Sequence, residues 1–378
     1  MTPAKKILVV GGGIAGLCTA IGLRNTGMAV DIVELNPKWD VYGVGIIQLA
    51  NALRALAALG LADEAVAQGY PMSGLRLHAP NGHVIADIPQ PQLAGPNFPA
   101  QNGIARPRLH KILQDAAQAT GANVRLGITV QAIAQEEAQD ADGVQVTFTD
   151  GSTGDYDLVV GADGLRSTVR QLVFGNAEQP KYEGQVVWRY NLPRPAHVTD
   201  IWMWMGDPKV GIVPLSAETM YIFITDAAPE GVPKLPADSL AEEMRKRLAG
   251  YPGLIAELSP QITDASKVVL RPFETILVPT PWHRGRVVLV GDSAHAMTAH
   301  IAQGAAMAIE DAVVLTEELK QHDDVNTVLA NYNQRRFERV KAIVEMSRQI
   351  CEWERNHDPK ADVMGVTVRS MQVAAQPI

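Results

Sequence analysis

The fold of this chain is decided by the stretch Lys6-Ile-Leu-Val-Val-Gly-Gly-Gly-Ile-Ala-Gly16 and by Val30-Asp-Ile-Val-Glu34, which follows it. The apolar residues before the first glycine predict a buried strand, and the residues after the glycines predict a helix that leads into a second strand. A strand, a glycine turn, a helix and a strand that ends in an acid form the fingerprint of a site for the ADP half of a dinucleotide. The motif alone does not separate NAD from FAD.

Each glycine of the turn has its own physical role. Gly11 permits the tight turn, Gly13 lets the backbone approach the pyrophosphate, and Gly16 lets the helix pack closely on the strand. The helix start offers free N–H groups and the positive end of its dipole to the phosphates. Glu34 is placed to accept hydrogen bonds from a ribose. A glycine turn without a ligand is the disfavoured alternative, because strand, helix and acid all fall in register.

The bulk composition is that of an ordinary globular protein. The chain has 378 residues, of which 47% are hydrophobic and 20% charged, so it can bury a large core in two units or one elaborated fold. The formal net charge of −8 argues against nucleic acid or an anionic membrane as a standing partner. A small anionic substrate remains compatible with an acidic surface.

The two cysteines, Cys18 and Cys351, form neither a CxxC pair nor a metal-ligand cluster, so we predict no metal site and a reducing, cytoplasmic location. The uncharged run from Ile7 to Leu23 imitates the core of a secretory signal, but its glycines and the following strand are better explained by the dinucleotide site. No other apolar run approaches the length of about 20 residues that a membrane span needs.

Two further glycine–acid signatures follow predicted buried strands. The first is Asp157-Leu-Val-Val-Gly-Ala-Asp-Gly164, and the second is Arg286-Val-Val-Leu-Val-Gly-Asp292. Helical spacing follows the second signature, from about Gln303 to Leu319. Because ligands gather at the carboxyl ends of strands in an open parallel sheet, all three signatures are expected to lie together.

In this order and spacing, the three motifs resemble the single-component FAD-dependent aromatic hydroxylases, the family of para-hydroxybenzoate hydroxylase and salicylate hydroxylase. The resemblance covers about residues 5–345, and the run Ala302-Gln-Gly-Ala-Ala-Met-Ala-Ile-Glu-Asp311 looks most like the branch that contains 6-hydroxynicotinate 3-monooxygenase. It implies an α/β fold with a doubly wound, Rossmann-like FAD domain, an inserted antiparallel β-sheet substrate domain and a long C-terminal helix. The expected divisions are an FAD-binding domain over 1–70, 100–180 and 276–355, a substrate domain over 71–99 and 181–275, and a loosely held tail over 356–378.

The resemblance also assigns roles to residues that match its motifs. It implies that Gly11, Gly13, Gly16 and Glu34 hold the ADP part of FAD and that Arg106 lies near the ribityl and phosphate region. It also implies that Asp163 is shared between contacts with FAD and with NAD(P)H and that Asp292 binds a ribityl hydroxyl. Gly304 is implied to present backbone N–H groups to the pyrimidine edge of the flavin. The sequence departs from the family in the loop from His295 to Gly304, where both usual prolines are absent. We therefore expect this loop to be less rigid than in relatives.

The activity implied by the resemblance is a monooxygenase reaction. FAD, NADH or NADPH as a transient co-substrate, and O₂ would hydroxylate a small phenolic or hydroxypyridine-type substrate through a flavin C4a-hydroperoxide. Two alternatives stay open: an FAD-dependent oxidase or dehydrogenase without oxygen insertion, and an FAD-binding protein that has lost catalysis. The substrate's identity and a homodimeric state are left open.

Catalytic candidates follow from the chemistry, because deprotonation makes the ring electron-rich and a base should help. His300 is the first candidate, since it lies in the flavin loop and histidine titrates near neutrality; a structural role has nearly equal weight. Tyr190 and Tyr221 are candidates to orient a hydroxyl or carboxylate, although packing is the commoner role of Tyr on a strand. Arg189 is a weaker candidate to bind a substrate carboxylate, because an exposed strand face or a structural ion pair is favoured. His295 is expected to order the turn at Asp292.

Overall fold

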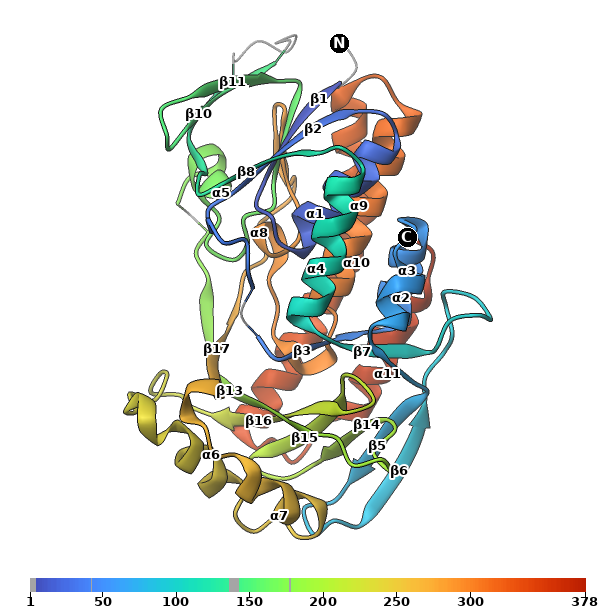
Figure 1. Ribbon diagram of the computed structural model, residues 1–378, viewed down its shortest axis with the longest axis vertical. Coiled ribbons are helices and arrows are strands. Elements are labelled where there is room, and N and C mark those ends of the chain that lie inside the picture. Colours follow the sequence, from blue (N-terminus) through green and yellow to red (C-terminus); the bar gives the residue numbers. More distant parts are fainter. Residues whose placement is uncertain (1–4, 42, 136–142, 177) are drawn as a thin grey trace.

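The computed structural model describes residues 5–41, 43–135, 143–176 and 178–378. The molecule is elongated, with a parallel sheet and its helices at one end and a larger mixed sheet at the other (Figure 1). The predicted α/β class, with a long helix near the C-terminus, is confirmed.

The first sheet gathers the three glycine–acid signatures. Its strand order is β18 (His283–Arg284), β19 (Val287–Leu289), β12 (Leu158–Gly161), β1 (Lys6–Val10), β2 (Ala29–Glu34) and β8 (Asn123–Leu126). All neighbours from β19 to β8 run parallel, and only β18 is antiparallel. Because β1, β12 and β19 are adjacent, the three motifs meet at one edge of the sheet, as the sequence predicted.

Helices surround this sheet, and close packing explains two glycines of the turn. The helices of this end are α1 (Ile14–Asn25), α2 (Ala50–Ala58), α3 (Ala62–Ala67), α4 (Arg106–Ala119), α5 (Thr168–Phe174), α8 (Asp292–His295), α9 (Gly304–Gln321) and α10 (Val325–Asn356). A Cβ on Gly16 would lie 1.9 Å from the carbonyl oxygen of Gly11, and one on Gly11, where φ is +109°, would lie 2.4 Å from that of Ala162. Only glycine therefore allows α1 to start so close to β1 and β12.

The larger sheet has seven strands. Their order is β17 (Val269–Thr275), β13 (Lys181–Pro193), β16 (Thr219–Ala227), β15 (Lys209–Pro214), β14 (Ile201–Trp204), β5 (Gly74–His78) and β6 (Val84–Pro89). The β14–β5 pair is parallel, so the sheet is mixed rather than wholly antiparallel as expected. Sequence texture cannot reveal this, because β5 comes from a separate excursion of the chain. One face packs against α6 (Leu240–Leu248), α7 (Leu254–Leu258) and the short helices Ala237–Ser239, Ser259–Gln261 and Ala265–Lys267.

Two small antiparallel sheets complete the fold. One contains β3 (Gly45–Gln48), β7 (Gln101–Ala105) and β4 (Tyr70–Met72), and the other contains β11 (Thr153–Tyr156), β10 (Val144–Phe148) and β9 (Val130–Gln135). The first of these lies between the parallel sheet and the large sheet (Figure 1). This small sheet therefore forms part of the region that joins the two ends of the molecule.

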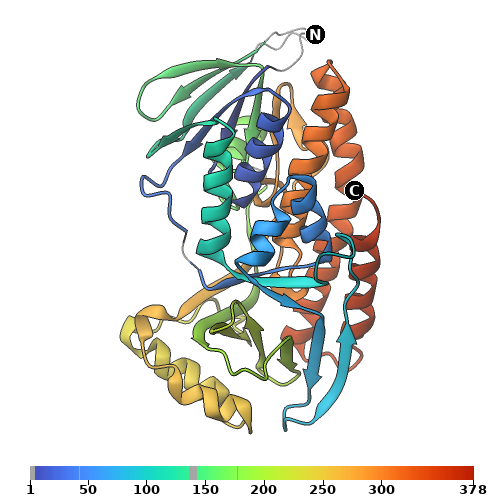
Figure 2. The same ribbon diagram turned by 45° about the vertical axis from the view of Figure 1, so that its right-hand side comes forward.

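The expected loose tail is instead a packed helix, α11 (Val363–Ala375). It lies along α10 (Figure 2), and arginines hold its last carbonyl oxygens. Arg54 donates to the oxygens of Ala374 and Gln376 at 3.0 and 2.8 Å, and Arg339 donates to that of Val373 at 2.6 Å. Cations at a helix C-terminus satisfy carbonyls that have no partner within the helix. Among the described residues, no helix combines the length and apolarity of a membrane span.

Candidate active site

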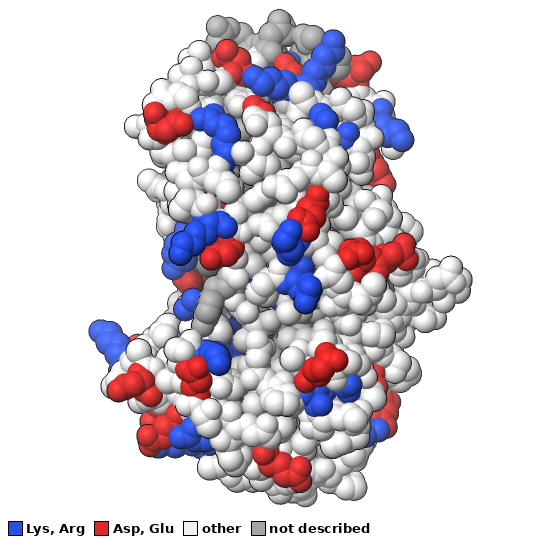
Figure 3. Space-filling view, in the orientation of Figure 1, with Lys and Arg blue, Asp and Glu red and all other residues white. Residues whose placement is uncertain are grey.

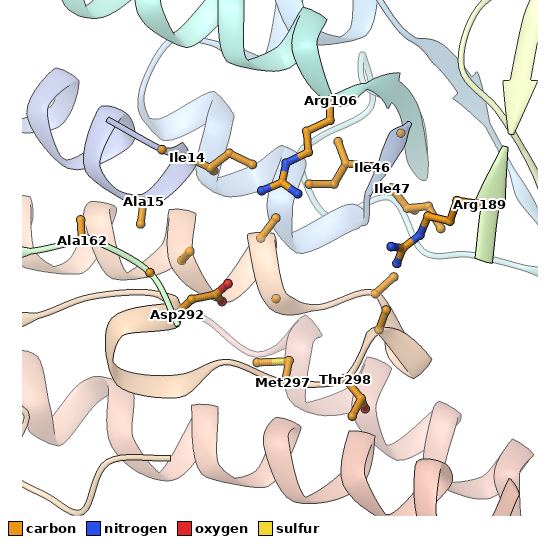
Figure 4. A pocket seen from close by; sticks show the side chains of 18 of the residues that line it. Ile14, Ala15, Ile46, Ile47, Arg106, Ala162, Arg189, Asp292, Met297 and Thr298 are labelled. Carbon is orange, nitrogen blue, oxygen red and sulfur yellow. The ribbon is translucent and has the colours of Figure 1, made fainter. Parts of the chain in front are cut away.

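A cavity of about 340 Å³, here called the central cavity, lies where the parallel sheet meets the large sheet. Its walls come from the starts of α1 and α9, from β3, from the start of α4, from the loop after β12, from residues 292–302 and from the large sheet. Figure 4 shows this arrangement. The carboxyl ends of the parallel strands therefore open directly into it.

Two helix N-termini point their free N–H groups at this cavity. Gly13 and Ala15 at the start of α1, and Gly304 and Ala305 at the start of α9, all line it. Neither helix has a side chain that caps its first N–H groups. A Cβ on Gly13 would meet no heavy atom within 4 Å, so the backbone there is open to an incoming group. Two uncapped helix starts with open backbone fit the phosphates and the pyrimidine edge of FAD.

Three charged side chains converge on the central cavity from different elements (Figure 4). Arg106 comes from the start of α4, Arg189 from β13, and Asp292 from the turn after β19. The carboxylate of Asp292 points into the cavity, and burial in the surrounding protein raises its pKa. Two cations, two helix starts and a single carboxylate make the cavity favourable for an anionic ligand that also carries hydroxyl groups.

Arg189 and Tyr221 form the end of the cavity made by the large sheet. Residues 189 and 221 lie on neighbouring strands β13 and β16, and both side chains face the cavity. Within the described chain, the guanidinium of Arg189 has no ion pair or hydrogen bond, so of the two roles favoured from the sequence the structural ion pair is not found, and the side chain lines the cavity with intermediate exposure. Burial lowers the pKa of Arg189, and burial raises that of Tyr221 to about 12.

Tyr190 lies on the opposite face of β13 from Arg189. Its ring packs in the core between the large sheet and α6, and its hydroxyl accepts a long hydrogen bond (3.4 Å) from the backbone N–H of Asp264. Successive residues of a strand point to opposite faces. Tyr190 and Tyr221 are therefore not brought together, and the geometry of Tyr190 matches the packing alternative.

His300 is also turned away from the central cavity. Its Nδ1 lies 2.9 Å from Thr298 Oγ1, and its Nε2 lies 3.0 Å from Gln185 Oε1 and 3.3 Å from Glu354 Oε2. Burial lowers its pKa, against the opposing effect of Glu354. A ring that is bonded at both nitrogens and does not line the central cavity is poorly placed to take a proton from a substrate there, so the geometry does not support the predicted role as base.

Two acids carried over from the family motifs make internal hydrogen bonds. Glu34 accepts from the backbone N–H groups of Gly12 and Asn36, both at 2.7 Å, which fixes the glycine turn. Asp163 accepts from the N–H groups of Thr168 and Val169 at 2.6 and 3.0 Å, which caps α5. Neither lines the central cavity, although Ala162 and Gly164 beside Asp163 do.

A buried ion network behind the cavity escaped the sequence analysis. Asp311 accepts from the N–H of Gly291 at 2.8 Å, from Arg336 at 2.8 Å and lies 2.6 Å from His295 Nε2. The neighbouring Glu310 pairs with Arg336 and Arg339 at 2.7 and 2.8 Å. Burial acts to raise the pKa of Asp311, but His295 and Arg336 outweigh it and hold it below its usual value. The network fixes the turn that presents Asp292, as expected for His295.

A second buried cluster joins the large sheet to α10 and to the loop from His295 to Gly304. It consists of Lys209, Glu354 and His300. Lys209 Nζ pairs with Glu354 Oε1, and only 7% of the lysine side chain and 16% of the glutamate side chain is exposed. Burial acts to raise the pKa of Glu354, but Lys209 and His300 lower it to about 2. The sequence does contain one indication of both clusters. Each has an acidic residue on the otherwise apolar, buried face of a helix, and a buried carboxylate needs a cation beside it.

Comparisons with known proteins agree with this site. A sequence model of the family described as FAD binding domain matches residues 4–347. The chain is 32% identical over 364 residues to aurachin C monooxygenase/isomerase of Stigmatella aurantiaca, covering 94% of this chain and 91% of that protein. It is 30% identical over 357 residues to FAD-dependent urate hydroxylase of Klebsiella pneumoniae, covering 92% and 90%. The structure of Klebsiella pneumoniae HpxO with FAD and uric acid superposes with a TM-score of 0.84 at 27% identity, covering 98% of this chain and 93% of that one.

Proposed function

The chain belongs to the FAD binding domain family, whose relatives include FAD-dependent monooxygenases, and on that premise we propose that it hydroxylates a small phenolic or hydroxypyridine-type ring with NAD(P)H and O₂. The observation that carries the proposal is the central cavity, in which two helix starts, Arg106 and Asp292 adjoin Arg189 and Tyr221. The overall reaction consumes one O₂, one NAD(P)H and one proton: one oxygen atom converts a ring C–H to C–OH, the other leaves as water, and NAD(P)H is oxidised to NAD(P)⁺.

The residues of the parallel sheet would hold FAD, which supplies the electron transfer and oxygen activation. The open backbone at Gly13 would receive the pyrophosphate, and Asp292 would accept a hydrogen bond from a ribityl hydroxyl. Arg106 would add positive charge near the ribityl and phosphate region. The uncapped start of α9 at Gly304 would stabilise negative charge at the flavin pyrimidine edge.

The large sheet would hold the substrate. Arg189 is a half-buried cation that has no hydrogen bond or ion pair within the described chain, and an anionic ligand in the central cavity would pair with it. A phenolate or a ring carboxylate meets that need, and Tyr221, whose pKa burial raises to about 12, can donate a hydrogen bond to the same oxygen. The uric acid bound by HpxO supports a ring substrate of this size.

With Arg189 beside the substrate oxygen, the proposed reaction does not require a histidine base to ionise the phenol. A cation within a few ångströms of a phenol oxygen stabilises its ionised form and lowers the pKa of the phenol. The proton can then leave to solvent rather than to a protein side chain. This role makes the ring electron-rich before oxygen transfer.

The test is the consumption of NADH and NADPH by the FAD-loaded protein with a panel of phenols, hydroxybenzoates and hydroxypyridines, with peroxide measured in parallel. We expect one ring class to stimulate consumption strongly, with little peroxide and with oxygen from ¹⁸O₂ in the product. Flavin reduction by a donor without NAD(P)H, with peroxide formed in proportion, would instead establish the oxidase alternative.

A further inference from the structure

The carbonyl oxygen of Gly12, in the middle of the glycine turn, lies within hydrogen-bond distance of two aromatic side chains from other parts of the chain. The indole Nε1 of Trp39 donates to it at 3.1 Å, and the Nε2 of His110 lies 2.8 Å from it. A carbonyl oxygen can only accept, so the second bond requires that the ring of His110 carries a proton on Nε2. Neither ring lines the central cavity, and the proposed reaction assigns a role to neither.

Both rings are buried and held in place. Trp39 lies in the loop after β2, and His110 lies on α4, which packs beside α1 (Figure 1). Only 6% of Trp39 and 3% of His110 is exposed, and the two rings meet edge to face with their centroids 6.2 Å apart. Gln114, one turn further along α4, donates to the carbonyl oxygen of Trp39 at 2.5 Å. A Cβ on Gly12 would lie 2.4 Å from Trp39 Nε1, so the indole can approach only because residue 12 is glycine.

The two bonds to the Gly12 oxygen fix the direction of the Gly13 N–H. These two groups belong to one planar trans peptide, in which C=O and N–H point in opposite directions. Because the oxygen is held toward Trp39 and His110, the N–H is directed away from both rings, and Gly13 itself lines the central cavity. Among the residues that the structure describes, this N–H has no acceptor, so it is available to a phosphate oxygen.

The rest of the glycine turn is held by other bonds, which do not reach this peptide. The N–H of Gly11 donates to the carbonyl oxygen of Val33 at 2.8 Å, and the N–H of Gly12 donates to Glu34 at 2.7 Å. Within the described chain, the peptide that joins Gly12 to Gly13 has no hydrogen bond other than those from the two rings. A glycine on each side gives this peptide little steric resistance to rotation. The rings therefore determine its orientation.

We propose that Trp39 and His110 are positioning residues for FAD, which hold the peptide between Gly12 and Gly13 so that its N–H faces the pyrophosphate. The inference rests on the FAD binding that the proposed function includes, and it names the side chains that prepare the turn for the cofactor. Without both rings, the peptide is free to rotate and to present its oxygen, in place of its N–H, to the phosphates. An oxygen there would repel the anionic pyrophosphate.

The test measures FAD binding by the apoprotein from the quenching of flavin fluorescence, without substrate or NAD(P)H. Trp39→Phe and His110→Met each remove one donor and should weaken Kd about threefold, because the remaining ring still holds the oxygen. The double variant should weaken Kd on the order of 30-fold, more than the product of about ninefold, because it releases the peptide. His110→Gln, whose amide can donate from the position of Nε2, should bind FAD as the wild type does.

Two controls separate positioning from folding. Leu113→Val, at a fully buried position of the same helix, should lower the Tm of the apoprotein without changing Kd for FAD. Riboflavin, which has no phosphate, should bind equally to the wild type and the double variant, whereas ADP, in competition with FAD, should lose as much affinity as FAD does. If the double variant does not fold, the comparison of His110→Met with His110→Gln tests the same bond.

The outcomes separate this inference from the proposed function. Additive effects of the two single variants, equal Kd values for His110→Gln and His110→Met, or an equal loss of riboflavin affinity would overturn the positioning role. A wild-type apoprotein that binds no FAD would overturn the proposed function, and the inference with it. The expected pattern of FAD binding, without hydroxylation of any ring compound, would support the positioning role while the proposed reaction fails.

Discussion

Replacing Glu354 by Gln should destabilise the protein, because the Glu354 carboxylate pairs with Lys209 and His300. The wild-type carboxylate has a pKa of about 2 instead of the usual 4.5, because the pairing with Lys209 and His300 outweighs burial. A difference of about 2.5 pH units corresponds to about 3 kcal/mol that the ionised form gains on folding. For 378 residues with about 2.1 cal/mol/K of unfolding entropy each, this loss lowers Tm by roughly 4 °C.

The sign of the pH dependence follows from the depressed pKa. A carboxylate whose folded-state pKa is lowered contributes its full stability above the unfolded value near 4.5 and loses it as the pH falls toward 2. The difference in Tm between the wild type and Glu354→Gln should therefore be constant from pH 5 to 8 and shrink below pH 4.5. Thermal unfolding followed by circular dichroism over pH 3.5–8 measures this.

Two controls make the measurement decisive. Glu352→Gln changes the charge identically on an exposed position of the same helix and should leave Tm within about 1 °C. Adding Lys209→Met to Glu354→Gln removes the stranded cation and should restore part of the loss. Equal effects of the two glutamate variants, or a difference that does not change with pH, would refute the reasoning.

Three further predictions concern the central cavity. Gly13→Ala should keep the stability of the apoprotein but weaken FAD binding at least tenfold by fluorescence titration, because its Cβ fills open space. Gly16→Ala should instead lower the free energy of unfolding in urea by about 3 kcal/mol, because its Cβ would lie 1.9 Å from the carbonyl oxygen of Gly11. Arg189→Met should raise KM for an anionic ring substrate on the order of 100-fold with FAD content unchanged, and Arg189→Lys should recover part of it. Tyr221→Phe should lower kcat/KM about tenfold without moving either limb of the pH profile between pH 6 and 10, since its pKa lies near 12.

The parallel sheet could be predicted from the sequence because the motifs that indicate it depend mainly on contacts between residues close in sequence. The close packing at Gly16 and the acid at the end of β2 reflect contacts within one βαβ unit, whereas Gly11 also lies against Ala162 after the neighbouring strand β12. Parallel strands with such turns place their ends together in only one way. On the face drawn in Figure 3, acidic and basic side chains are interspersed, without a broad patch of one charge.

The arrangement of side chains where the large sheet meets the central cavity could not be predicted from the sequence. It depends on which element covers each face of a strand, and this is set by tertiary packing. Both faces of β13 are covered, one by α6 and the other by the central cavity, so alternation of apolar residues did not distinguish Arg189 from Tyr190. Likewise, the position of His300 between Asp292 and Gly304 in sequence says nothing about the direction of its ring. Its partner Glu354 lies on α10, and only the packing of that helix brings the two together.

The loop that lacks the two usual prolines is held by side chains instead. Four of its residues bond buried partners on other elements: His295 with Asp311, Thr298 with Ser347, His300 with Glu354, and Gln303 with Asn51. A proline restricts one dihedral angle of its own residue, whereas these bonds fix the loop relative to α2, α9 and α10. The expected loss of rigidity is therefore offset by contacts that no local pattern reveals. It follows that the register of α10, through Ser347 and Glu354, helps to determine where the loop places Thr298 and Ala302 at the central cavity.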